Sequence, residues 1–227
     1  MKQDGLLTRR ETARMRGTMR LLALSAFVFC FLAVSPLQAA AGEGDKTAQP
    51  AAVELNRAER LITGSKYSAG FLGGYGFEIG SKPTLDFAEL LPFVTFPIGG
   101  VRGADSFYRG VWEYKVEGVV GLVTNMNDRG ISGVSPVGLR YNFTHLGGDF
   151  VPYVEALAGG VYVDVPRSVQ GTRGNFISTA ALGAKYFITE KTALQVHVRY
   201  RHLSNAGIRQ PNPGINTVSF FVGMSYY

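Results

Sequence analysis

Apolar residues alternate with small or polar residues along most of the chain from about residue 67 onward. In segment 192–204, the apolar row consists of Leu194, Val196, Val198 and Tyr200. The opposite row of the same segment consists of Gln195, His197, Arg199 and Arg201. A period of two indicates a β-strand with one apolar face, because successive side chains of a strand point to opposite sides.

Eight segments carry this pattern, and most of them have ten or more residues. They are 67–79, 86–98, 107–124, 132–143, 151–165, 174–187, 192–204 and 217–227. Strands of soluble proteins usually have about 5–6 residues, whereas a tilted strand that crosses a membrane needs about 9–11. The sequence therefore predicts an all-β fold, an eight-stranded antiparallel transmembrane (outer-membrane) β-barrel.

Charged residues in two of these segments lie opposite the apolar rows. In a membrane barrel they would line a polar interior, where His197, Arg199 and Arg201 are expected to pair with acids such as Glu113 or Glu117. The main alternative is a soluble barrel of the lipocalin type, in which the apolar rows would point inward and the charges would face water.

The N-terminal segment reads as an export signal. Six basic residues lie within residues 1–20. Residues 21–34 form a run of fourteen residues without a charge, and three consecutive alanines follow at 39–41. A run of this length is too short for a membrane-spanning helix, which needs about 20 residues, but it suits a signal peptide. We predict a signal peptide over 1–41, a flexible lead-in with at most a short helical turn over 42–66, and the barrel over 67–227.

The charge and cysteine content change once this segment is set aside. The whole chain has 23 basic and 17 acidic residues and a net charge of +6, with one cysteine, Cys30. Removal of 1–41 leaves 17 basic and 15 acidic residues, a net charge of +2, and no cysteine. We therefore expect no nucleic-acid partner and no disulfide framework. The three histidines are widely spread and no zinc or nucleotide-binding spacing is present, so neither a metal nor a cofactor is predicted.

The candidate chemistry lies at the end of segment 192–204. His202 and Ser204 are two residues apart and so share one face of a strand, and a hydroxyl beside a general base is the usual way to activate a serine nucleophile. Both belong to the apolar row, which faces lipid in a membrane barrel, where polar side chains are costly without a purpose. The natural substrate would then be a lipid of the outer leaflet. Alternatively, the two residues only mark the boundary with the lipid headgroups.

The stretch RHLSNAG at 201–207, followed by IRQPNPGIN at 208–216, resembles the lipid A 3-O-deacylase (PagL), or acyloxyacyl hydrolase, family. The resemblance covers about residues 67–227. It implies an outer-membrane barrel of Gram-negative cells with an outward-facing site that hydrolyses the ester-linked 3-hydroxyacyl chain at position 3 of lipid A. It also implies Ser204 as nucleophile, His202 as its base, and backbone donors around Asn205 and Gly207 as the oxyanion hole. Lipid A or lipopolysaccharide would be the substrate.

One position departs from the family pattern. Characterised members place a glutamate before the last strand to orient the histidine, but the matching residue here is Asn216, and no Asp or Glu occurs in 205–227. The Asn216 amide oxygen can accept a hydrogen bond from the imidazole, yet Asp to Asn in a serine triad lowers the rate roughly 10⁴-fold. The sequence thus predicts a working Ser-His-Asn arrangement or a slow or inactive relative. A non-catalytic barrel that binds lipopolysaccharide or stabilises the envelope is the second hypothesis, and a homodimer stays open.

Overall fold

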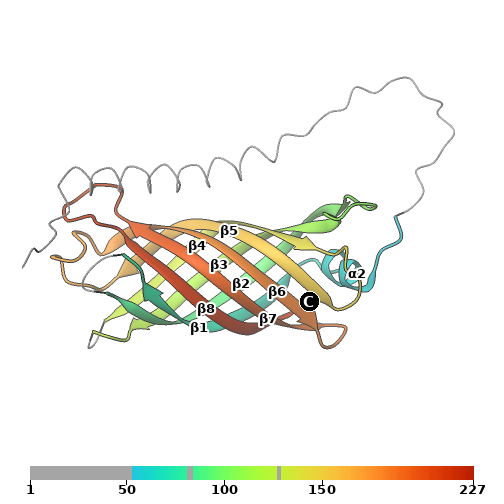
Figure 1. Ribbon diagram of the computed structural model, residues 1–227, viewed down its shortest axis with the longest axis horizontal. Coiled ribbons are helices and arrows are strands. Elements are labelled where there is room, and N and C mark those ends of the chain that lie inside the picture. The colour runs from blue at the N-terminus through green and yellow to red at the C-terminus, as the bar shows by residue number, and fades with distance from the viewer. Residues whose placement is uncertain (1–52, 81–83, 127–128) are drawn as a thin grey trace, which may run out of the picture. The chain divides into compact units, whose positions relative to one another are not determined.

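The structure is a computed structural model that describes residues 53–80, 84–126 and 129–227. The predicted signal peptide and the beginning of the predicted lead-in lie outside these ranges. The described part holds a short helix followed by eight long strands (Figure 1). They are α2 (Arg57–Gly64), β1 (Ser68–Glu78), β2 (Asp86–Arg102), β3 (Gly110–Val123), β4 (Gly130–Phe143), β5 (Phe150–Val163), β6 (Gly174–Phe187), β7 (Thr192–Ser204) and β8 (Ile215–Tyr226).

The eight strands form a closed antiparallel barrel, as the sequence predicts. Each strand pairs with its neighbour in the chain, and β8 pairs with β1, so the sheet has no free edge. The strand bounds agree with prediction to within a few residues except in β2, which continues to Arg102 instead of ending near 98. The pairing of β2 with β3 shifts register between Ile98 and Arg102, and this irregularity lets the strand continue past its alternating pattern.

The connections divide between the two ends of the barrel. Those after β2, β4 and β6 lie at the end that also carries α2 and the C-terminus, and those after β1, β3, β5 and β7 lie at the other end, here called the loop end (Figure 1). The predicted longer loops after β3, β5 and β7 therefore share one end, and the motif between β7 and β8 is among them.

The outward face of the barrel is apolar. On β7 and β8 the outward rows are well exposed, and they comprise Leu194, Val196, Val198, Tyr200, Phe220, Val222, Met224 and Tyr226. Such a surface suits contact with hydrocarbon, because lipid-facing strands of membrane barrels carry apolar residues on alternate positions. The soluble alternative, in which these rows point inward, is wrong.

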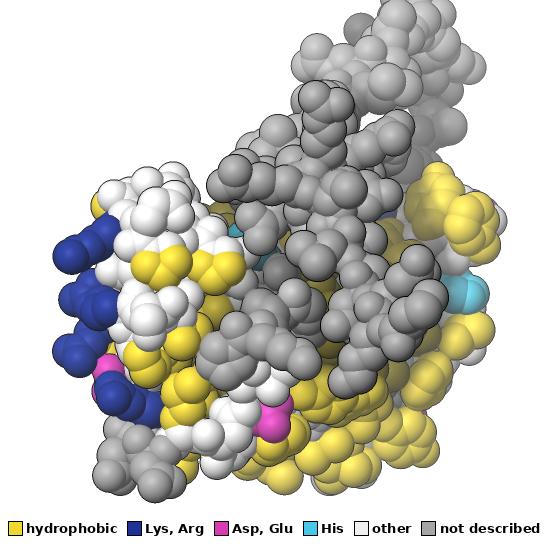
Figure 2. Space-filling view, turned by 60° about the vertical axis from the view of Figure 1, so that its left-hand side comes forward, with side chains coloured by type: hydrophobic (Ala, Val, Ile, Leu, Met, Phe, Trp, Pro, Cys, Tyr) yellow, Lys and Arg dark blue, Asp and Glu magenta, His cyan; other side chains and the backbone are white. Residues whose placement is uncertain are grey.

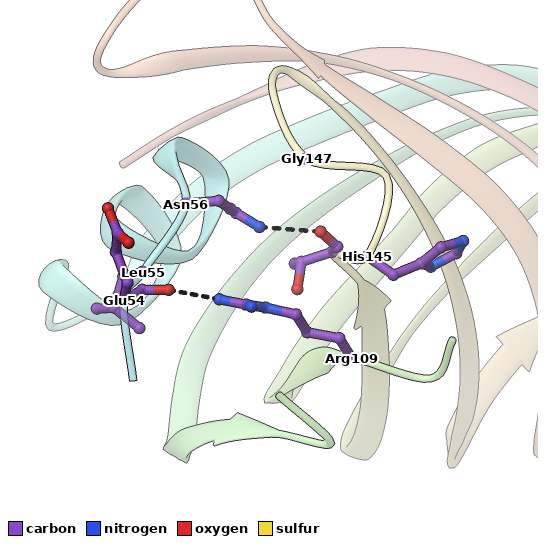
Figure 3. Close-up of a pocket in the computed structure, with 7 residues that line it drawn as sticks. Glu54, Leu55, Asn56, Arg109, His145 and Gly147 are labelled. Atoms are coloured by element: carbon purple, nitrogen blue, oxygen red, sulfur yellow. Dashed lines mark hydrogen bonds between the residues drawn. The ribbon is translucent and has the colours of Figure 1, made fainter. Parts of the chain in front are cut away.

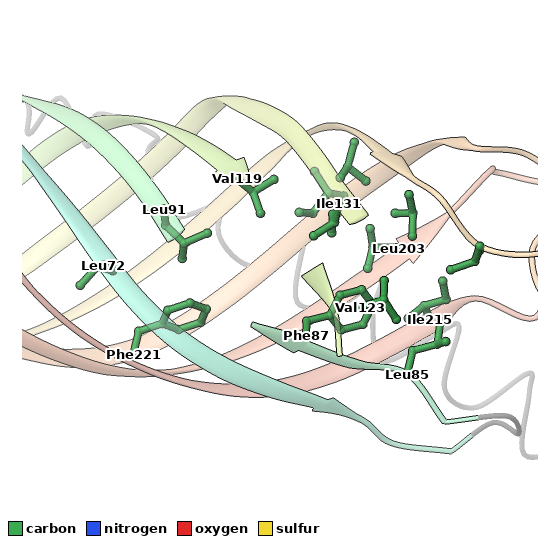
Figure 4. Packing of buried hydrophobic residues seen from close by; sticks show 14 of the residues in the cluster. Leu72, Leu85, Phe87, Leu91, Val119, Val123, Ile131, Leu203, Ile215 and Phe221 are labelled. Atoms are coloured by element: carbon green, nitrogen blue, oxygen red, sulfur yellow. The ribbon is translucent and has the colours of Figure 1, made fainter. Parts of the chain in front are cut away.

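The interior near the loop end is hydrophobic, which the sequence pattern does not predict. A cluster of buried apolar residues extends inward from this end (Figure 4) and includes Leu85, Phe87, Val123, Ile131, Leu203 and Ile215. Leu203, Arg201 and Arg199 follow one another on the inward face of β7, so charged residues begin directly below this layer. This hydrophobic layer lies between the loops and the charged residues of the lumen.

Charged side chains fill the middle of the barrel. Arg199 donates two hydrogen bonds to Glu117, at 2.6 and 2.8 Å. Lys115 Nζ lies 2.7 Å from Glu117 and 3.0 Å from Glu155, to which Arg140 Nε also donates at 2.9 Å. Burying charges removes their hydration, so these pairs add little net stability, but removing one member would leave an unpaired buried charge.

Helix α2 packs against the end of the barrel opposite the loop end. Asn56 caps the helix: its side chain accepts from the Glu59 backbone, and the Glu59 carboxylate accepts in return from the Asn56 backbone. Ala58 and Ile62 lie one turn apart and are buried against a cluster that includes Val111. Among the described residues, no helix is both long enough and apolar enough to cross a membrane.

Polar contacts fix this helix to two turns of the barrel. The Glu59 carboxylate accepts from Arg109 Nε at 2.7 Å and from the Thr144 hydroxyl at 2.6 Å. Asn56 Nδ2 donates to the Thr144 carbonyl at 2.9 Å, and Arg109 also donates to the Glu54 carbonyl, as Figure 3 shows. The sequence predicted a flexible lead-in with at most a short helical turn. Over 57–64 the structure instead has a capped helix that is held to the barrel by hydrogen bonds.

Candidate active site

The motif residues lie where β7 ends and β8 begins, on the outward face at the loop end. His202 and Ser204 continue the exposed row of Val196, Val198 and Tyr200, and both are half-buried. Their inward neighbours, Leu203 among them, are fully buried. The predicted lipid-facing placement of His202 and Ser204 therefore agrees with the structure.

His202 and Asn216 meet across the pairing of β7 with β8. They are direct register partners, and His202 Nδ1 lies 2.7 Å from Asn216 Oδ1. Because an amide oxygen only accepts hydrogen bonds, the imidazole carries its proton on Nδ1 in this contact. The lone pair is then on Nε2, which makes no hydrogen bond within the described part of the chain and is available as a base.

Gly214 lies against the edge of the same imidazole. A Cβ atom at this position would come within 2.8 Å of His202 Cε1, and the backbone φ of +78° is one that favours glycine. The Asn-Pro-Gly part of the motif thus leaves room for the ring as it turns the chain into β8.

The structure does not join Ser204 to His202 by a hydrogen bond. Within the described residues, the Ser204 hydroxyl has no hydrogen-bond partner, although it lies on the same face two residues further along. Catalytic hydrogen bonds are often long or misaligned before substrate binds. A second outward serine, Ser178 on β6, is the direct register partner of His202, so two hydroxyls flank the imidazole.

Both predicted oxyanion donors are already engaged. The Asn205 N–H donates to Asn212 Oδ1 at 3.0 Å, and the Gly207 N–H donates to Asn205 Oδ1 at 3.0 Å. Ala206 lies between them with a positive φ of 52°, and its N–H has no partner among the residues that the structure describes. Within the described part of the chain, the turn therefore offers one free backbone donor, the Ala206 N–H, two residues after Ser204 and between the two predicted donors.

Two polar side chains of the motif, Asn205 and Asn212, hold the loop in place by hydrogen bonds. The Asn205 side chain is fully buried and also donates to the Arg209 carbonyl at 2.7 Å. Asn212 Oδ1 accepts a second bond from Gln170 Nε2 at 2.9 Å, and this ties the loop to the connection between β5 and β6. The Gly171 N–H reinforces that link by donating to the Pro211 carbonyl at 2.7 Å.

The lumen pairing directly beneath the site differs in part from prediction. Arg199 pairs with Glu117 as expected, but Arg201 pairs with Glu89, a β2 residue, and its Nε donates to Thr217 on β8 at 3.2 Å. His197 lies 3.2 Å from the Tyr153 hydroxyl. The register and tilt of the closed barrel decide which strands face one another across the lumen, and the pattern of a single strand does not contain that information.

Basic residues gather among the loops of the loop end. Figure 2 shows them in dark blue along one margin, beside hydrophobic side chains of the barrel wall in yellow. Arg173 Nε lies 3.2 Å from Asp164, and Arg129 Nη1 lies 3.1 Å from the same carboxylate. Arg209 is exposed. Positive charge at this end suits an anionic lipid surface.

Comparison with known families settles the relationship of the chain. The profile of the family described as lipid A 3-O-deacylase (PagL) matches residues 93–225. This match spans β3 to β8 and includes the whole motif. The chain belongs to the lipid A 3-O-deacylase (PagL) family. The resemblance seen in the motif is therefore confirmed.

A solved structure with low sequence identity shares the fold of this PagL-family chain. Neisserial surface protein A (NspA) is 12% identical, with 71% of this chain and 97% of that chain covered and a TM-score of 0.52. The outer membrane enzyme PagL is 20% identical, with 69% and 97% covered and a TM-score of 0.48. Comparison with curated proteins gave no match. The fold class, an eight-stranded antiparallel barrel of the outer-membrane type, agrees with the prediction.

Four residues near the site were not among the sequence candidates. Tyr200 was counted only as part of the apolar row, yet its hydroxyl donates to Asn216 Oδ1 at 2.9 Å. Asn212 and Gln170 brace the loop, and Ser178 lies beside His202. Asn212 stands within the Asn-Pro-Gly motif and was readable as a turn residue. Tyr200 and Ser178 become visible only once neighbouring strands are paired, and Gln170 only once the two loops lie together.

Proposed function

We propose that this chain is an outer-membrane carboxylic ester hydrolase that removes the ester-linked 3-hydroxyacyl chain at position 3 of lipid A. The observation that carries the proposal is the His202–Asn216 contact on the lipid-facing side, beside Ser204. It would supply an oriented base next to a hydroxyl on the outward face near the loop end of the barrel. Membership of the PagL family supports the reaction and the substrate class.

Ser204 and His202 would divide the chemistry in the usual way. His202 Nε2 takes the proton as Ser204 Oγ attacks the ester carbonyl, and a tetrahedral intermediate forms. When this collapses, the bond to the sugar oxygen breaks, and the imidazolium returns its proton to that oxygen. Water, activated by the same imidazole, then hydrolyses the acyl-serine and releases the 3-hydroxy fatty acid.

The turn after Ser204 would stabilise the oxyanion. Of the residues from Asn205 to Gly207, the Ala206 N–H is the donor that is available without rearrangement. The Asn205 and Gly207 N–H groups become donors if their present side-chain acceptors give way to the substrate. Backbone donors aimed at developing negative charge commonly supply a large part of ester hydrolysis rates.

Asn216 would act as the third catalytic residue by holding the imidazole in the tautomer with Nε2 free. A neutral amide can fix the tautomer, but it cannot offset the positive charge that His202 acquires in the transition state. We therefore expect a working but slow enzyme compared with a relative that carries a carboxylate at this position.

The fold and the sequence support a proposal for the location of the protein. We propose export by a signal peptide at 1–41 and residence of the barrel, residues 67–227, in the outer membrane. With the α2 end facing the periplasm, the loop end and the site would meet the outer leaflet, where lipid A and lipopolysaccharide reside. Outer-membrane barrels carry their longer loops on that side.

A second candidate is a non-catalytic barrel that binds lipopolysaccharide. Two observations favour it: the hydroxyl of Ser204 makes no hydrogen bond within the described chain, and Asn216 replaces an acid. The two candidates make opposite predictions for turnover, so one experiment separates them.

The test is incubation of the purified, refolded protein with lipid A, followed by mass spectrometry. The expected product has lost one 3-hydroxyacyl chain, and Ser204→Ala abolishes the loss. The matched control is Ser178→Ala, because Ser178 also flanks His202 but is followed by strand backbone and not by a turn with a free N–H. We expect this control to keep its activity. The esterase proposal is contradicted if Ser204→Ala deacylates lipid A as well as the native protein does, or if the native protein does not deacylate it.

A further inference from the structure

The oxygen of Asn216 serves two donors at once. Tyr200 Oη donates to Asn216 Oδ1 at 2.9 Å, and His202 Nδ1 lies 2.7 Å from the same atom. Tyr200 and His202 are two residues apart on the outward face of β7. Asn216 is the direct partner of His202 on β8 and the diagonal neighbour of Tyr200, whose direct partner is Val218. Long side chains reach diagonal neighbours in antiparallel sheets.

An asparagine at this position poses a problem that a carboxylate does not. Its two ends have similar shape, but Oδ1 only accepts hydrogen bonds and Nδ2 only donates them. With Oδ1 toward His202, the ring proton lies on Nδ1, and Nε2 can take the proton of Ser204. With the amide turned over, Nδ2 donates to Nδ1, the ring proton moves to Nε2, and the imidazole is no longer a base for the serine.

Tyr200 favours the first of these two arrangements. Its hydroxyl hydrogen has Asn216 Oδ1 as its acceptor, and the hydroxyl makes no other hydrogen bond within the described part of the chain. Turning the amide over would place Nδ2 where Oδ1 now lies, and the phenolic hydrogen of Tyr200 would have no acceptor from the described part of the protein. A hydrogen bond of ordinary net strength biases such an equilibrium roughly two- to tenfold.

We propose that Tyr200 is a positioning residue that selects the amide orientation of Asn216 and, through it, the tautomer of His202 that can act as a base. This inference rests on the proposed function, because it concerns the same site. It assigns a task to a residue that otherwise looks like one more aromatic side chain on the lipid-facing wall.

The kinetic test is a double-mutant cycle with lipid A in detergent micelles. Tyr200→Phe removes only the hydroxyl, and we expect it to lower kcat roughly two- to tenfold with KM unchanged. In the Asn216→Asp background both ends of the side chain accept hydrogen bonds, so its orientation no longer depends on Tyr200. There Tyr200→Phe should change kcat less than twofold, which is about the smallest effect expected from the loss of one hydrogen bond. Equal losses in the two backgrounds would overturn the proposal.

The control is Tyr162→Phe. Tyr162 is also an outward tyrosine near the loop end, 46% exposed, and its hydroxyl has no hydrogen-bond partner among the described residues. We expect native kcat and KM from this variant. If Tyr162→Phe loses as much kcat as Tyr200→Phe, removal of any outward tyrosine hydroxyl lowers kcat. The proposal that Tyr200 positions Asn216 would then be contradicted.

A second readout does not depend on turnover. In protein labelled with ¹⁵N-histidine, the imidazole nitrogens of His202 report the tautomer, and His202→Gln identifies their signals among the three histidines. We expect the Nδ1–H form in the native protein and a growing Nε2–H population in Tyr200→Phe. A tautomer change in a protein without deacylase activity would reject the proposed function and keep the positioning role. An active native protein whose tautomer is unchanged by Tyr200→Phe would reject the positioning role alone.

Discussion

The Nδ1 atom of His202 and the amide oxygen of Asn216 lie 2.7 Å apart, across directly paired positions of β7 and β8. The acceptor that orients the histidine is therefore neutral and is fixed by the sheet itself. Strand register holds both backbones, so the contact does not depend on a flexible loop. Changing the charge of this acceptor should alter catalysis without altering the fold.

Asn216→Asp should raise kcat. A carboxylate of the same shape can accept from both Tyr200 and His202, and its charge stabilises the imidazolium that forms in the transition state. The gain should exceed tenfold, with the roughly 10⁴-fold effect of the reverse change in a serine triad as an upper limit. Initial rates of acyl release from lipid A, followed by mass spectrometry, measure it.

Asn216→Leu is the matched control for that change. It removes the acceptor while keeping a side chain of similar size, so the rate should fall below that of the native protein. A rate that is the same for Asn216→Asp, Asn216→Leu and the native chain would show that Asn216 plays no part in catalysis.

Gly214→Ala should inactivate the site while the barrel still folds. The added Cβ would lie 2.8 Å from His202 Cε1, so the imidazole must move away from Asn216. The left-handed backbone adds a strain of roughly 1–2 kcal/mol. Deacylation and heat-modifiable migration on a gel, measured on the same sample, separate loss of activity from loss of fold.

Gly148→Ala provides the comparison for strain alone. Gly148 has a φ of +69° and open space around its Cβ position, in the turn after β4. We expect a similar strain and full activity. If both variants lose activity to the same extent, the contact with His202 is not what makes Gly214 necessary.

Asn205→Ala should loosen the turn that follows Ser204. The buried side chain accepts from the Gly207 N–H and donates to the Arg209 carbonyl, and leaving such groups unsatisfied costs about 1–3 kcal/mol. Hydrogen exchange across 205–214 should accelerate, and kcat should fall because the oxyanion donors lose their fixed positions. Ile208→Ala, at an exposed position of the same loop, should leave exchange and kcat unchanged. If hydrogen exchange is unaltered in Asn205→Ala, the Asn205 side chain does not hold the turn in place.

The alternation of apolar and polar positions, together with the number and length of the alternating segments, was sufficient to predict the barrel and the outward face of His202. A strand has only two faces, and one of them must contact lipid, so Val196, Val198 and Tyr200 determine where Ser204 points. The same argument placed Arg199 inside. It gave no means of finding Glu89 as the partner of Arg201, because that contact depends on how far the strands are offset around the closed barrel.

The contacts of the site itself were only partly predictable. Asn216 was found because it stands where members of the resembled family place a glutamate, and the pairing of β7 with β8 puts it beside His202. The use of the Asn205 and Gly207 N–H groups within the loop was not foreseen, because loop geometry depends on side-chain acceptors such as Asn212. Helix α2 had a readable signal in Asn56 followed by Glu59 three residues later, but its anchor, Arg109, is distant in the chain.

The anchoring of α2 should depend on pH through Glu59. Burial by itself raises the pKa of this carboxyl, but hydrogen bonds from Arg109, from Thr144 and from the Asn56 backbone outweigh it and hold the pKa below its ordinary value of 4.5. The hydrogen bond to Glu59 in turn raises the pKa of Arg109. Because the carboxyl binds its proton less tightly when α2 is docked, the stabilisation is fully present above pH 4.5 and is lost as the pH falls through the lowered pKa.

Hydrogen exchange of residues 57–64, corrected for the intrinsic effect of pH, tests this dependence. In the native protein, protection should hold from pH 7 to about 4.5, near the ordinary pKa of glutamate, and decline below it. Glu59→Gln should lower protection at neutral pH, by about 1.5–3 kcal/mol for bonds to a charged group, and remove the decline. The control is Glu54→Gln, an exposed carboxyl whose backbone, not its side chain, contacts Arg109. The same decline in native protein and Glu59→Gln would mean that another group controls the docking of α2.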